Sequence, residues 1–548
     1  MRRSIPPLVL SSLACLACAP DTTVSDSGYV DGRTLVQVFE PDYRAPRVDL
    51  ILVVDDSASM GAFTPSWAEN LGAFAAVIEA EDVHADVRIA ITTTSVPGPT
   101  CAGPRAIGGE PSLSSCRSHL DDFVGADEHG ELGGEVVDRR AVCEDACSLA
   151  EIPRTLSPGR DDLDLSSLAL RPWIEPPHNP HGGNLDGVSL AEALTCVGLQ
   201  GSAGCSFESP IEAAARMVEH LGDPTHPLAE FRRPDAALMI LFVGDEDDCS
   251  HPDASASVFD PGGERLFWPD PAASEPTSGI CIRAGARCDA DGCALQDHAL
   301  DGTPTADPGG AVLMPTDRLR AALVAAGEYD DPVWIPYVAS IGGYTSQGDL
   351  YFAAAETEDA PEAQPWVEAF AIAPGCAAPQ PFGAPTLRAG PGARLAAAAS
   401  EGSLFSICEP DWSAAMAVFA ERIKPGFSPW CIEFECVADL TPDDPTLEPD
   451  CVLEEIDYAD ERTPIPACER DADGWLSEDD GYSYVYPAGA EACWVWRTDA
   501  DQSTASLLDD VDSVCADEGR LGNVAVTRKP GAPLPYASHY ELRCRPCG

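Results

Sequence analysis

The sequence predicts an α/β fold, with a doubly wound, mostly parallel sheet covered by helices and a small cysteine-rich domain of mainly β structure after it. Apolar stretches of strand type alternate with amphipathic helical stretches over residues 47–425, as in a parallel sheet with crossover helices. Two of the apolar stretches end in acids. The last part of the chain, 427–548, carries eight of the 22 cysteines. These three observations define the fold class that we expect.

The strands are predicted from apolar runs rich in β-branched residues. Pro336 lies inside one of these runs and favours an edge position or a bulge, because proline donates no ladder hydrogen bond. Helices are predicted from apolar positions at helical spacing, most clearly from Trp67 and from Trp412, where both patterns repeat at i+4, i+7, i+8 and i+11. The expected strands are 48–54, 86–94, 236–243, 333–341 and 403–408, and the expected helices are 67–78, 208–218, 316–326, 394–400 and 411–423.

Three long segments interrupt the alternation, at 97–195, 249–313 and 342–392. They hold many prolines, glycines and cysteines and few long periodic runs, so we expect insertions pinned by disulfides. In the tail, short alternating pieces at 482–486 and 523–527 predict β-hairpins of a cystine-stapled domain.

The charge excludes some classes of partner. With 33 basic and 91 acidic residues, the formal net charge is −58, which repels nucleic acid and acidic lipid headgroups and favours cations. The cysteines show no zinc-finger spacing and indicate a disulfide framework in an exported protein. Cys143 and Cys147 have helical spacing, and we expect them to bond to different partners.

The N-terminus predicts export. A basic start and a short apolar run, too short to span a bilayer, lead to Cys18, as in a bacterial lipoprotein signal over residues 1–18. Cys15 is the alternative anchor, but lipidation of Cys18 leaves 20 cysteines, an even number for ten bridges. An ordinary secretory signal stays open. Residues 19–46 are polar and aperiodic and fit a tether, so we expect a protein held at the outer membrane or cell surface by its N-terminal lipid only.

The stretch with the clearest chemistry follows the strand predicted at 48–54. Asp55, Ser57 and Ser59 stand two residues apart directly after it, and Asp245 follows the apolar run at 236–243. The carboxyl ends of parallel strands form the edge where open α/β sheets bind ligands. Carboxylates and hydroxyls suit a hard divalent cation such as Mg²⁺, Ca²⁺ or Mn²⁺. We therefore predict that these four residues hold a divalent cation.

The pattern Asp-x-Ser-x-Ser after an apolar strand resembles the metal-ion-dependent adhesion site of von Willebrand factor type A domains, which have a Rossmann-like sheet. Three further phrases are similar to lipid-anchored proteins of this class of the myxobacterial type: Gly204–Glu208, Asp245–Ser250 and Phe405–Cys408. The resemblance implies a disulfide between Cys196 and Cys205 across the site loop. It also implies a protein that binds a partner's carboxylate through the cation.

The family adds a Thr or Ser from a middle loop to the metal site. In the stretch 201–208, Ser202 and Ser206 are the only hydroxyls. Ser202 is the preferred ligand by this resemblance, and Ser206 is the alternative. Counting back strictly from Pro210 leads near Cys205, so the middle ligand departs from the family pattern.

Other candidates are weaker. Residues 469–480 follow part of an EF-hand pattern but begin with Glu, end with Asp and lack flanking helices, which favours a polar β-turn. Glu246, Asp247 and Asp248 predict a solvated acidic turn, with a second cation as the alternative. His178 and His181 lie in a proline-rich stretch, which favours a solvent loop over a zinc site.

The sequence supports binding over catalysis, and we expect no enzyme activity. The first alternative is a Mg²⁺-dependent phosphatase-like hydrolase, since an apolar strand ending in Asp also opens the haloacid-dehalogenase phosphatases. Those proteins carry a second Asp where this chain has Ser57, and that Asp is the general acid. The second alternative is a structural envelope protein whose metal only stabilises the fold.

Overall fold

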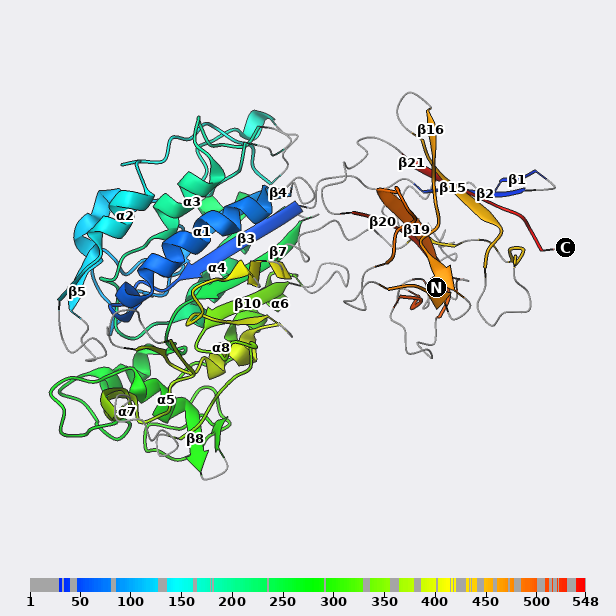
Figure 1. Cartoon of the computed structure of the whole chain (residues 1–548). Coiled ribbons are helices and arrows are strands. Elements are labelled where there is room, and N and C mark those ends of the chain that lie inside the picture. Colours follow the sequence, from blue (N-terminus) through cyan, green and yellow to red (C-terminus); the bar gives the residue numbers. More distant parts are fainter. Residues whose placement is uncertain are drawn as a thin grey trace, which may run out of the picture. The chain divides into compact units, whose positions relative to one another are not determined.

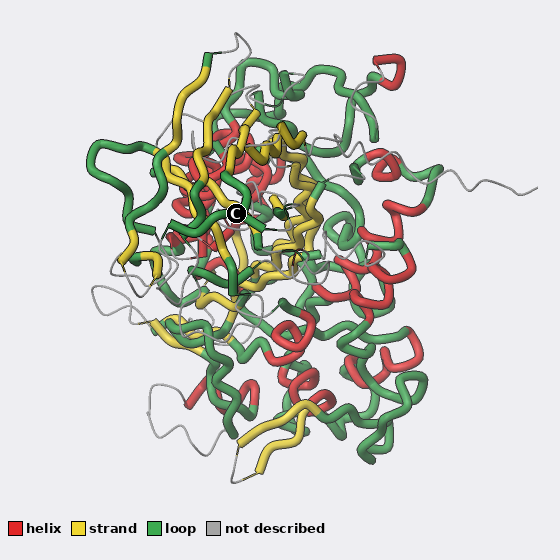
Figure 2. The backbone as a smooth tube through the Cα atoms, turned by 90° about the vertical axis from the view of Figure 1, so that its right-hand side faces the viewer, coloured by secondary structure: helices red, strands yellow, loops and turns green. Residues whose placement is uncertain are grey.

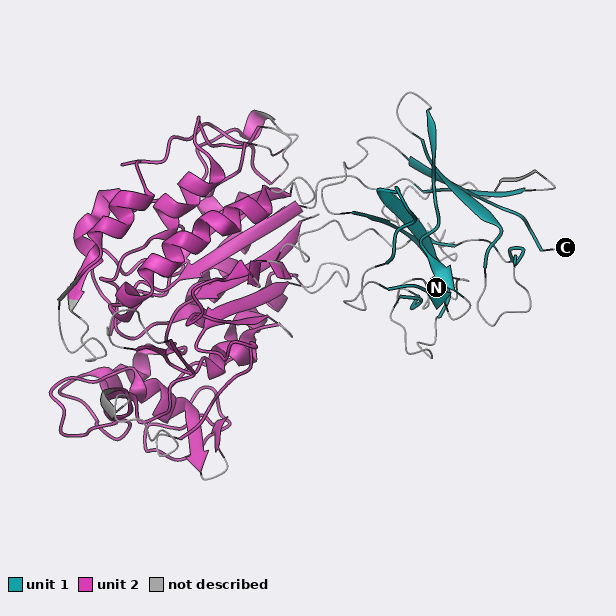
Figure 3. Ribbon diagram, viewed as in Figure 1, with its two compact units in different colours: residues 1–42, 427–548 teal, residues 43–426 magenta. Residues whose placement is uncertain are grey.

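The computed structural model forms two compact units, one of residues 43–426 and one of residues 1–42 with 427–548 (Figure 3). The predicted signal and both candidate lipidation sites, Cys15 and Cys18, lie outside the described residues. No helix among the described residues has the length and apolar character needed to cross a membrane. The described residues are 29–31, 34–39, 47–79, 85–126, 136–160, 165–177, 179, 182–233, 236–289, 292–328, 336–354, 364–378, 386–400, 403–413, 415–416, 418–419, 430–432, 434, 436–440, 448–456, 461–471, 474–477, 484–499, 508–511, 515, 520, 522–529 and 539–547.

The larger unit contains a five-stranded sheet in which every neighbouring pair is parallel (Figure 1). The strand order is β13-β10-β7-β3-β4, so the chain goes from β3 outward to β4 and then returns to the other side of β3. This reversal puts the topological switch point, where open α/β sheets bind ligands, between β3 and β7. The strands are β3 (Arg47–Val54), β4 (Asp86–Thr93), β7 (Ala237–Val243), β10 (Tyr337–Gly342) and β13 (Leu404–Ser406).

Helices cover both faces of this sheet, so the predicted α/β class is confirmed. Alternate residues of β3 point to opposite faces: Leu50 and Leu52 pack in one core cluster, and Ile51 and Val53 pack in the other. One cluster contains α1 (Thr64–Ile78), α3 (Leu190–Gly198) and the apolar residues from Trp412 to Phe419; the other contains α4 (Pro210–Gly222), α6 (Arg318–Ala325) and α8 (Ala393–Ala398).

Three local predictions about these core elements have different outcomes. The residues predicted as one helical face from Trp67 are all buried in α1, as expected. Pro336 does not mark an edge strand or a bulge, because β10 begins at Tyr337 and pairs with β7 on one side and β13 on the other. The proline precedes the ladder and therefore removes no hydrogen bond from it. The predicted helix 411–423 starts later than expected, because Asp411 and Trp412 are not helical; its described residues from Ser413 to Phe419 are helical, and its end from 420 lies outside the described residues.

The insertions contain short elements. The predicted loop insertion 97–195 ends too late, because α3 starts at Leu190 and packs on the sheet. In the second insertion, β8 and β9 form the hairpin at the bottom of Figures 1 and 2. The elements are η1 (Ser59–Ala62), η2 (Cys116–Phe123), β5 (Val124–Ala126), β6 (Val136–Asp138), α2 (Arg140–Ala146), η3 (Leu165–Ser167), η4 (Pro227–Glu230), η5 (Asp253–Phe259), α5 (Gly279–Gly285), β8 (Ala286–Asp289), β9 (Gly292–Leu295), α7 (Gln364–Phe370), β11 (Cys376–Ala378) and β12 (Leu387–Ala389).

Twenty cysteines form ten disulfides, as the parity of the sequence predicts. This density is typical of exported proteins, because reducing compartments do not maintain structural disulfides. Cys143 and Cys147 have different partners, as expected, whereas the bridge between Cys196 and Cys205 is wrong, because α2 ends against α3 and brings Cys147 to Cys196. The pairs are 101–205, 116–143, 147–196, 249–281, 288–293, 376–408, 431–515, 436–547, 451–544 and 468–493.

The smaller unit is antiparallel β structure stapled by four of these bridges. It holds a five-stranded sheet, β1-β2-β21-β15-β16, and a three-stranded sheet, β14-β20-β19. The bounds are β1 (Tyr29–Asp31), β2 (Thr34–Phe39), β14 (Trp430–Cys431), β15 (Cys451–Ile456), β16 (Arg462–Ile465), β17 (Arg470–Asp471), β18 (Gly474–Trp475), β19 (Ala492–Arg497), β20 (Asn523–Arg528) and β21 (His539–Cys544).

Two predictions concern this unit. The tether predicted at 19–46 does not extend over its whole range, since β2 pairs along β21 at the far end of the chain, with Leu35 opposite Cys544. The EF-hand-like stretch contains the antiparallel pair of β17 and β18, in agreement with a β-turn there.

Candidate metal centre

Asp55 and Asp245, the two acids that we expect to lie close together, follow the ends of two neighbouring parallel strands. Val54 of β3 lies opposite Val243 of β7, so the residues that follow them emerge at one edge of the sheet. The backbone N–H of Asp55 donates to the carbonyl of Val243 at 2.8 Å, which fixes the start of the loop after β3. Both acids lie at the switch point because each strand ends in an apolar run, Leu50–Val54 before Asp55 and Leu238–Val243 shortly before Asp245.

A chain of hydrogen bonds connects the four predicted ligands. The N–H of Ser57 donates to Oδ1 of Asp55 at 2.8 Å, and the hydroxyls of Ser57 and Ser59 lie 2.9 Å apart. The hydroxyl of Ser59 donates to Oδ1 of Asp245 at 3.2 Å. All four side chains are buried, with at most 5% of the surface of each residue exposed. The structure thus brings together Asp55, Ser57, Ser59 and Asp245.

Gly244 makes room for the first of these acids. A Cβ on Gly244 would lie 2.9 Å from Oδ2 and 3.0 Å from Cβ of Asp55. A side chain at this position would therefore displace the Asp55 carboxylate from the edge of the sheet.

The predicted middle ligand lies beside the site, and its hydroxyl has another partner. Ser202 is buried, and its Oγ lies near η1, 3.7 Å from where a Cβ on Gly61 would be. Its N–H and its hydroxyl both donate to the carbonyl of Asp122, at 2.7 and 3.3 Å. The alternative, Ser206, is half-buried. Its contact with the metal ligands, like that of Ser202, stays a prediction.

Glu208 is a further acid at the site that the sequence pattern did not predict. This residue is 2% exposed, and neither carboxylate oxygen receives a hydrogen bond from the described residues. Burial raises the pKa of Glu208 well above its ordinary value, and the nearby Glu246 and Asp55 raise it further. Its carbonyl accepts from the N–H of Cys249, which follows the acidic loop after β7, at 2.8 Å. The sequence offered one indication of this role. Glu208 lies two positions before Pro210, close to where von Willebrand factor type A domains have the hydroxyl of their middle loop.

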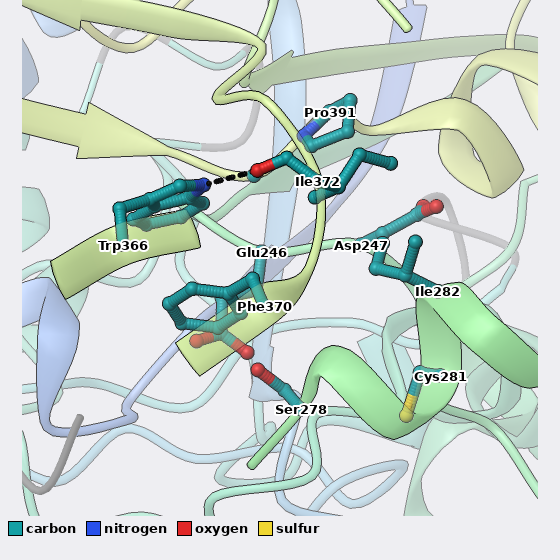
Figure 4. Close-up of a pocket in the computed structure, with 10 residues that line it drawn as sticks. Glu246, Asp247, Ser278, Cys281, Ile282, Trp366, Phe370, Ile372 and Pro391 are labelled. Carbon is teal, nitrogen blue, oxygen red and sulfur yellow. Dashed lines mark hydrogen bonds between the residues drawn. The ribbon is translucent and has the colours of Figure 1, made fainter. Parts of the chain in front are cut away.

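Glu246 is a second acid that faces the site. It is buried, and its Oε2 receives no hydrogen bond from the part of the chain that is described. Glu246 lines a small cavity together with Ser278, Trp366 and Phe370 from the second and third insertions (Figure 4). The cavity has about 10 Å³ of free volume, the size of a single water site. The insertions therefore cover this side of the metal centre.

The prediction of a solvated acidic turn at 246–248 is wrong, because Asp247 and Asp248 are also buried and stabilise helix starts. Asp247 accepts from the backbone N–H of Arg394 in the first turn of α8, at 2.9 Å. Asp248 accepts from the N–H of Ile211 in the first turn of α4, at 3.0 Å, and lies 3.4 Å from Nε of Arg394. Burial raises the pKa of Asp247 to about 7, against the opposing charge of Arg394. These bonds account for both carboxylates without a second cation.

Asp56 positions the middle loop. Its Oδ1 accepts from the hydroxyl of Ser95 at 2.7 Å, and its carbonyl accepts from the N–H of Gly204 at 2.6 Å. Arg105 lies 3.6 Å from its other oxygen. Burial raises the pKa of Asp56 to about 6, although Ser95 and Arg105 oppose the shift. Asp56 therefore acts as a structural acid that connects the end of β4 to the middle loop.

The electrostatics of the site suit a cation. Burial raises the pKa of Asp55 to about 7, partly offset by the hydrogen bond from Ser57 and reinforced by the charge of Glu246. Four carboxylates converge here, from Asp55, Glu208, Asp245 and Glu246, and burying several like charges together is strongly unfavourable without a counter-ion. The donor set is all oxygen, with two hydroxyls, and fits Mg²⁺, Ca²⁺ or Mn²⁺.

Comparisons with known proteins identify no family: neither a family model nor a curated protein matches the chain. Among solved structures, the chain is similar to the pilus adhesin SpaC from Lactobacillus rhamnosus GG in its open conformation, with 10% identity and a TM-score of 0.29, covering 93% of this chain and 40% of that one. It is also similar to the pilus adhesin RrgA from Streptococcus pneumoniae, with 8% identity and a TM-score of 0.24, covering 95% of this chain and 60% of that one. The chain thus spans less than two thirds of either adhesin, and likeness at these TM-scores carries no information about the site.

Proposed function

We propose that this protein is a cell-surface binding protein with a von Willebrand factor type A domain that acts through a divalent cation. The observation that carries the proposal is the convergence of Asp55, Ser57, Ser59 and Asp245 at the switch point between β3 and β7. The cation is Mg²⁺, Ca²⁺ or Mn²⁺, with Ser202 as the proposed hydroxyl of the middle loop. The export signal ends at Cys18, whose lipid anchors the protein to the outer membrane or cell surface.

In this proposal, one coordination position belongs to a partner. A carboxylate of an Asp or Glu on a partner protein or surface ligand completes the cation's oxygen shell, as the resemblance to adhesion sites implies. The net charge of −58 opposes most acidic partners at long range, so only a partner shaped for the site brings its carboxylate close enough. Nucleic acid is not a partner for the same electrostatic reason.

A second function is favoured by the two acids Glu208 and Glu246. Both are buried beside Asp55, and either carboxylate is a chemically suitable replacement for a partner's. In that case the cation is held entirely by this chain and stabilises the fold of an envelope protein. Catalysis has less support than either, because Ser57 stands where the phosphatases carry their general acid.

One experiment separates the two functions. Peptides that contain Asp or Glu are arrayed beside matched peptides with Asn or Gln, and the full chain is applied with Mg²⁺, with Ca²⁺ or with EDTA. The adhesion function predicts binding to the acidic set only, in the presence of cation only. Thermal stabilisation by cation with no difference between the peptide sets would leave the structural function in its place.

A further inference from the structure

A cluster of two histidines and a carboxylate lies outside the proposed metal centre. His220 is in the last turn of α4, His226 precedes η4, and Glu110 comes from the first insertion. Nε2 of His220 lies 3.3 Å from Oε1 of Glu110, and Nε2 of His226 lies 3.1 Å from Oε2. The two imidazole rings are stacked, with centroids 3.8 Å apart and planes 9° from parallel. Both ring nitrogens therefore face one carboxylate from the same side.

The backbone holds this arrangement in place. Gly109, with a φ of 92°, packs against Arg216 of α4 so closely that a Cβ would lie 2.7 Å from the Cβ of Arg216. This contact puts the next residue, Glu110, opposite His220, which is one helical turn beyond Arg216. His226 is fixed from the other side, since its Nδ1 accepts from the N–H of Leu228 at 3.2 Å.

The ligand atoms of the three side chains have the spacing of a metal site, and the two parallel rings would turn toward a shared ion, because an imidazole binds a metal in the plane of its ring. Suitable ligand atoms of all three residues lie within 4.8 Å of one another. In a tetrahedral zinc site with bonds of about 2.0–2.1 Å, the ligand atoms are about 3.3–3.4 Å apart. The two nitrogen-to-oxygen distances, 3.3 and 3.1 Å, are close to this edge length. Imidazole nitrogens favour Zn²⁺ and related transition ions over Mg²⁺ and Ca²⁺.

We propose that His220, His226 and Glu110 bind a divalent transition metal ion, with Zn²⁺ as the best fit, and that water completes the coordination. The ion connects the first insertion to the end of α4. It lies on elements other than β3 and β7, so this proposal does not depend on the proposed function.

Binding changes the protonation of His226. Because its Nδ1 accepts from Leu228, the proton of the neutral ring is on Nε2 in the metal-free chain. A neutral ring that binds a metal through Nε2 carries its proton on Nδ1, so metal binding needs the other tautomer and the hydrogen bond from Leu228 is lost. The loss of this hydrogen bond opposes metal binding, so the site binds Zn²⁺ more weakly than a preformed structural zinc site.

The test uses the full chain in buffer with excess Mg²⁺ and Ca²⁺, which occupy the oxygen-rich sites. Zn²⁺ affinity is measured by competition with a chromophoric chelator, and Co²⁺ replaces Zn²⁺ so that visible absorption reports tetrahedral coordination. The variants are His220→Gln, Glu110→Gln and His226→Asn, the last of which keeps an acceptor for the N–H of Leu228. The control is His298→Gln, because His298 is a partly buried histidine in a different insertion.

The proposal expects one Zn²⁺ ion bound by wild type, by the His298 variant and by Asp55→Ala, with a tetrahedral Co²⁺ spectrum in each. Each of the three cluster variants should lower the affinity at least about 10-fold and abolish that spectrum. Unchanged affinity in the cluster variants would overturn the proposal. Circular dichroism checks that every variant is folded, so that a loss of affinity is not mistaken for a loss of structure. Loss of the ion in Asp55→Ala alone would assign it to the oxygen site instead.

Discussion

Ser59 donates a hydrogen bond to Asp245, 186 positions further along the chain, at 3.2 Å. The bond joins the loop after β3 to the loop after β7, the two strands that border the switch point. It holds a hydroxyl and a carboxylate in contact at one edge of the sheet. The geometry therefore brings oxygen atoms of the kind that divalent cations prefer together from two distant parts of the sequence.

Replacing Glu208 should have opposite effects with and without cation. In Glu208→Gln the amide can donate to the carboxylates of Asp55 and Glu246, so the cation-free chain should gain about 1–3 kcal/mol in free energy of unfolding. The same change removes a carboxylate near the ion and should weaken cation affinity. Thermal unfolding in EDTA and in Ca²⁺ measures both effects. A loss of stability in EDTA would contradict the view that Glu208 is an uncompensated acid.

A methyl group at Gly244 should damage the metal centre and spare the fold. The Cβ of Gly244→Ala would meet the Asp55 carboxylate at 2.9 Å, and we expect cation affinity to fall about 10–100-fold. The matched control is Gly72→Ala on α1, where a Cβ meets nothing within 4 Å. That variant should gain about 0.5–1 kcal/mol and keep its affinity. Equal affinities in the two variants would mean that Asp55 does not bind the ion.

The buried arginine at the other end of the sheet should matter most for stability. Arg233 contacts Asp49 at 2.9 Å and Asp86 at 2.6 Å, and all three are buried. Arg233→Gln removes the cation that both acids share and leaves Asp49 with Arg232 and Asp86 with Arg47, so we expect a loss near the lower end for a broken buried ion pair, about 3 kcal/mol. The control, Arg140→Gln, removes an ion pair with the half-exposed Asp138 and should cost at most about 1 kcal/mol. Similar losses in the two variants would argue against the buried network.

His251 should make the protein less stable in mild acid. Burial lowers its pKa, although the carbonyl of Cys249 and the charges of Asp248 and Asp253 oppose this. The unfolded chain therefore binds a proton at His251 more readily. The stability contribution is complete above the unfolded pKa of about 6.5 and is lost as pH falls below it.

The matched variant for this prediction is His251→Gln. In the wild type, Nε2 of His251 lies 3.0 Å from the hydroxyl of Thr100, and the ring stacks on Phe259 with centroids 4.1 Å apart. The substitution leaves both of these neighbouring residues unchanged. The variant should lose less Tm than wild type between about pH 7 and about pH 5. Parallel decreases in Tm would show that other groups cause the acid sensitivity.

Local patterns predicted the strands and the first half of the site. The apolar run before Asp55 and the helical face from Trp67 depend on residues close in sequence, and side-chain period alone defines them. The same holds for Asp245, since only Gly244 separates it from the most apolar run. The five-stranded parallel sheet and the two-sided helix cover follow from this alternation.

The remaining features of the site depend on contacts between residues far apart in the sequence, which local patterns do not reveal. Asp248 is buried because Arg394 reaches it from 146 positions away, and an acidic run carries no sign of such a partner. Glu208 faces the site because the disulfide from Cys101 to Cys205 and the bond from Gly204 to Asp56 fix the middle loop. The pairing of β2 with β21 similarly connects the two ends of the chain.

The central claim is that the acids after β3 and β7 bind a divalent cation. Calorimetric titration of the full chain with Mg²⁺, Ca²⁺ and Mn²⁺, wild type against Asp55→Ala, tests it most directly. We predict one ion bound by wild type at the oxygen site and a loss of affinity of at least about 100-fold in the variant, since even residues behind a metal ligand contribute about 10–100-fold. Identical titrations for the two proteins would contradict the claim.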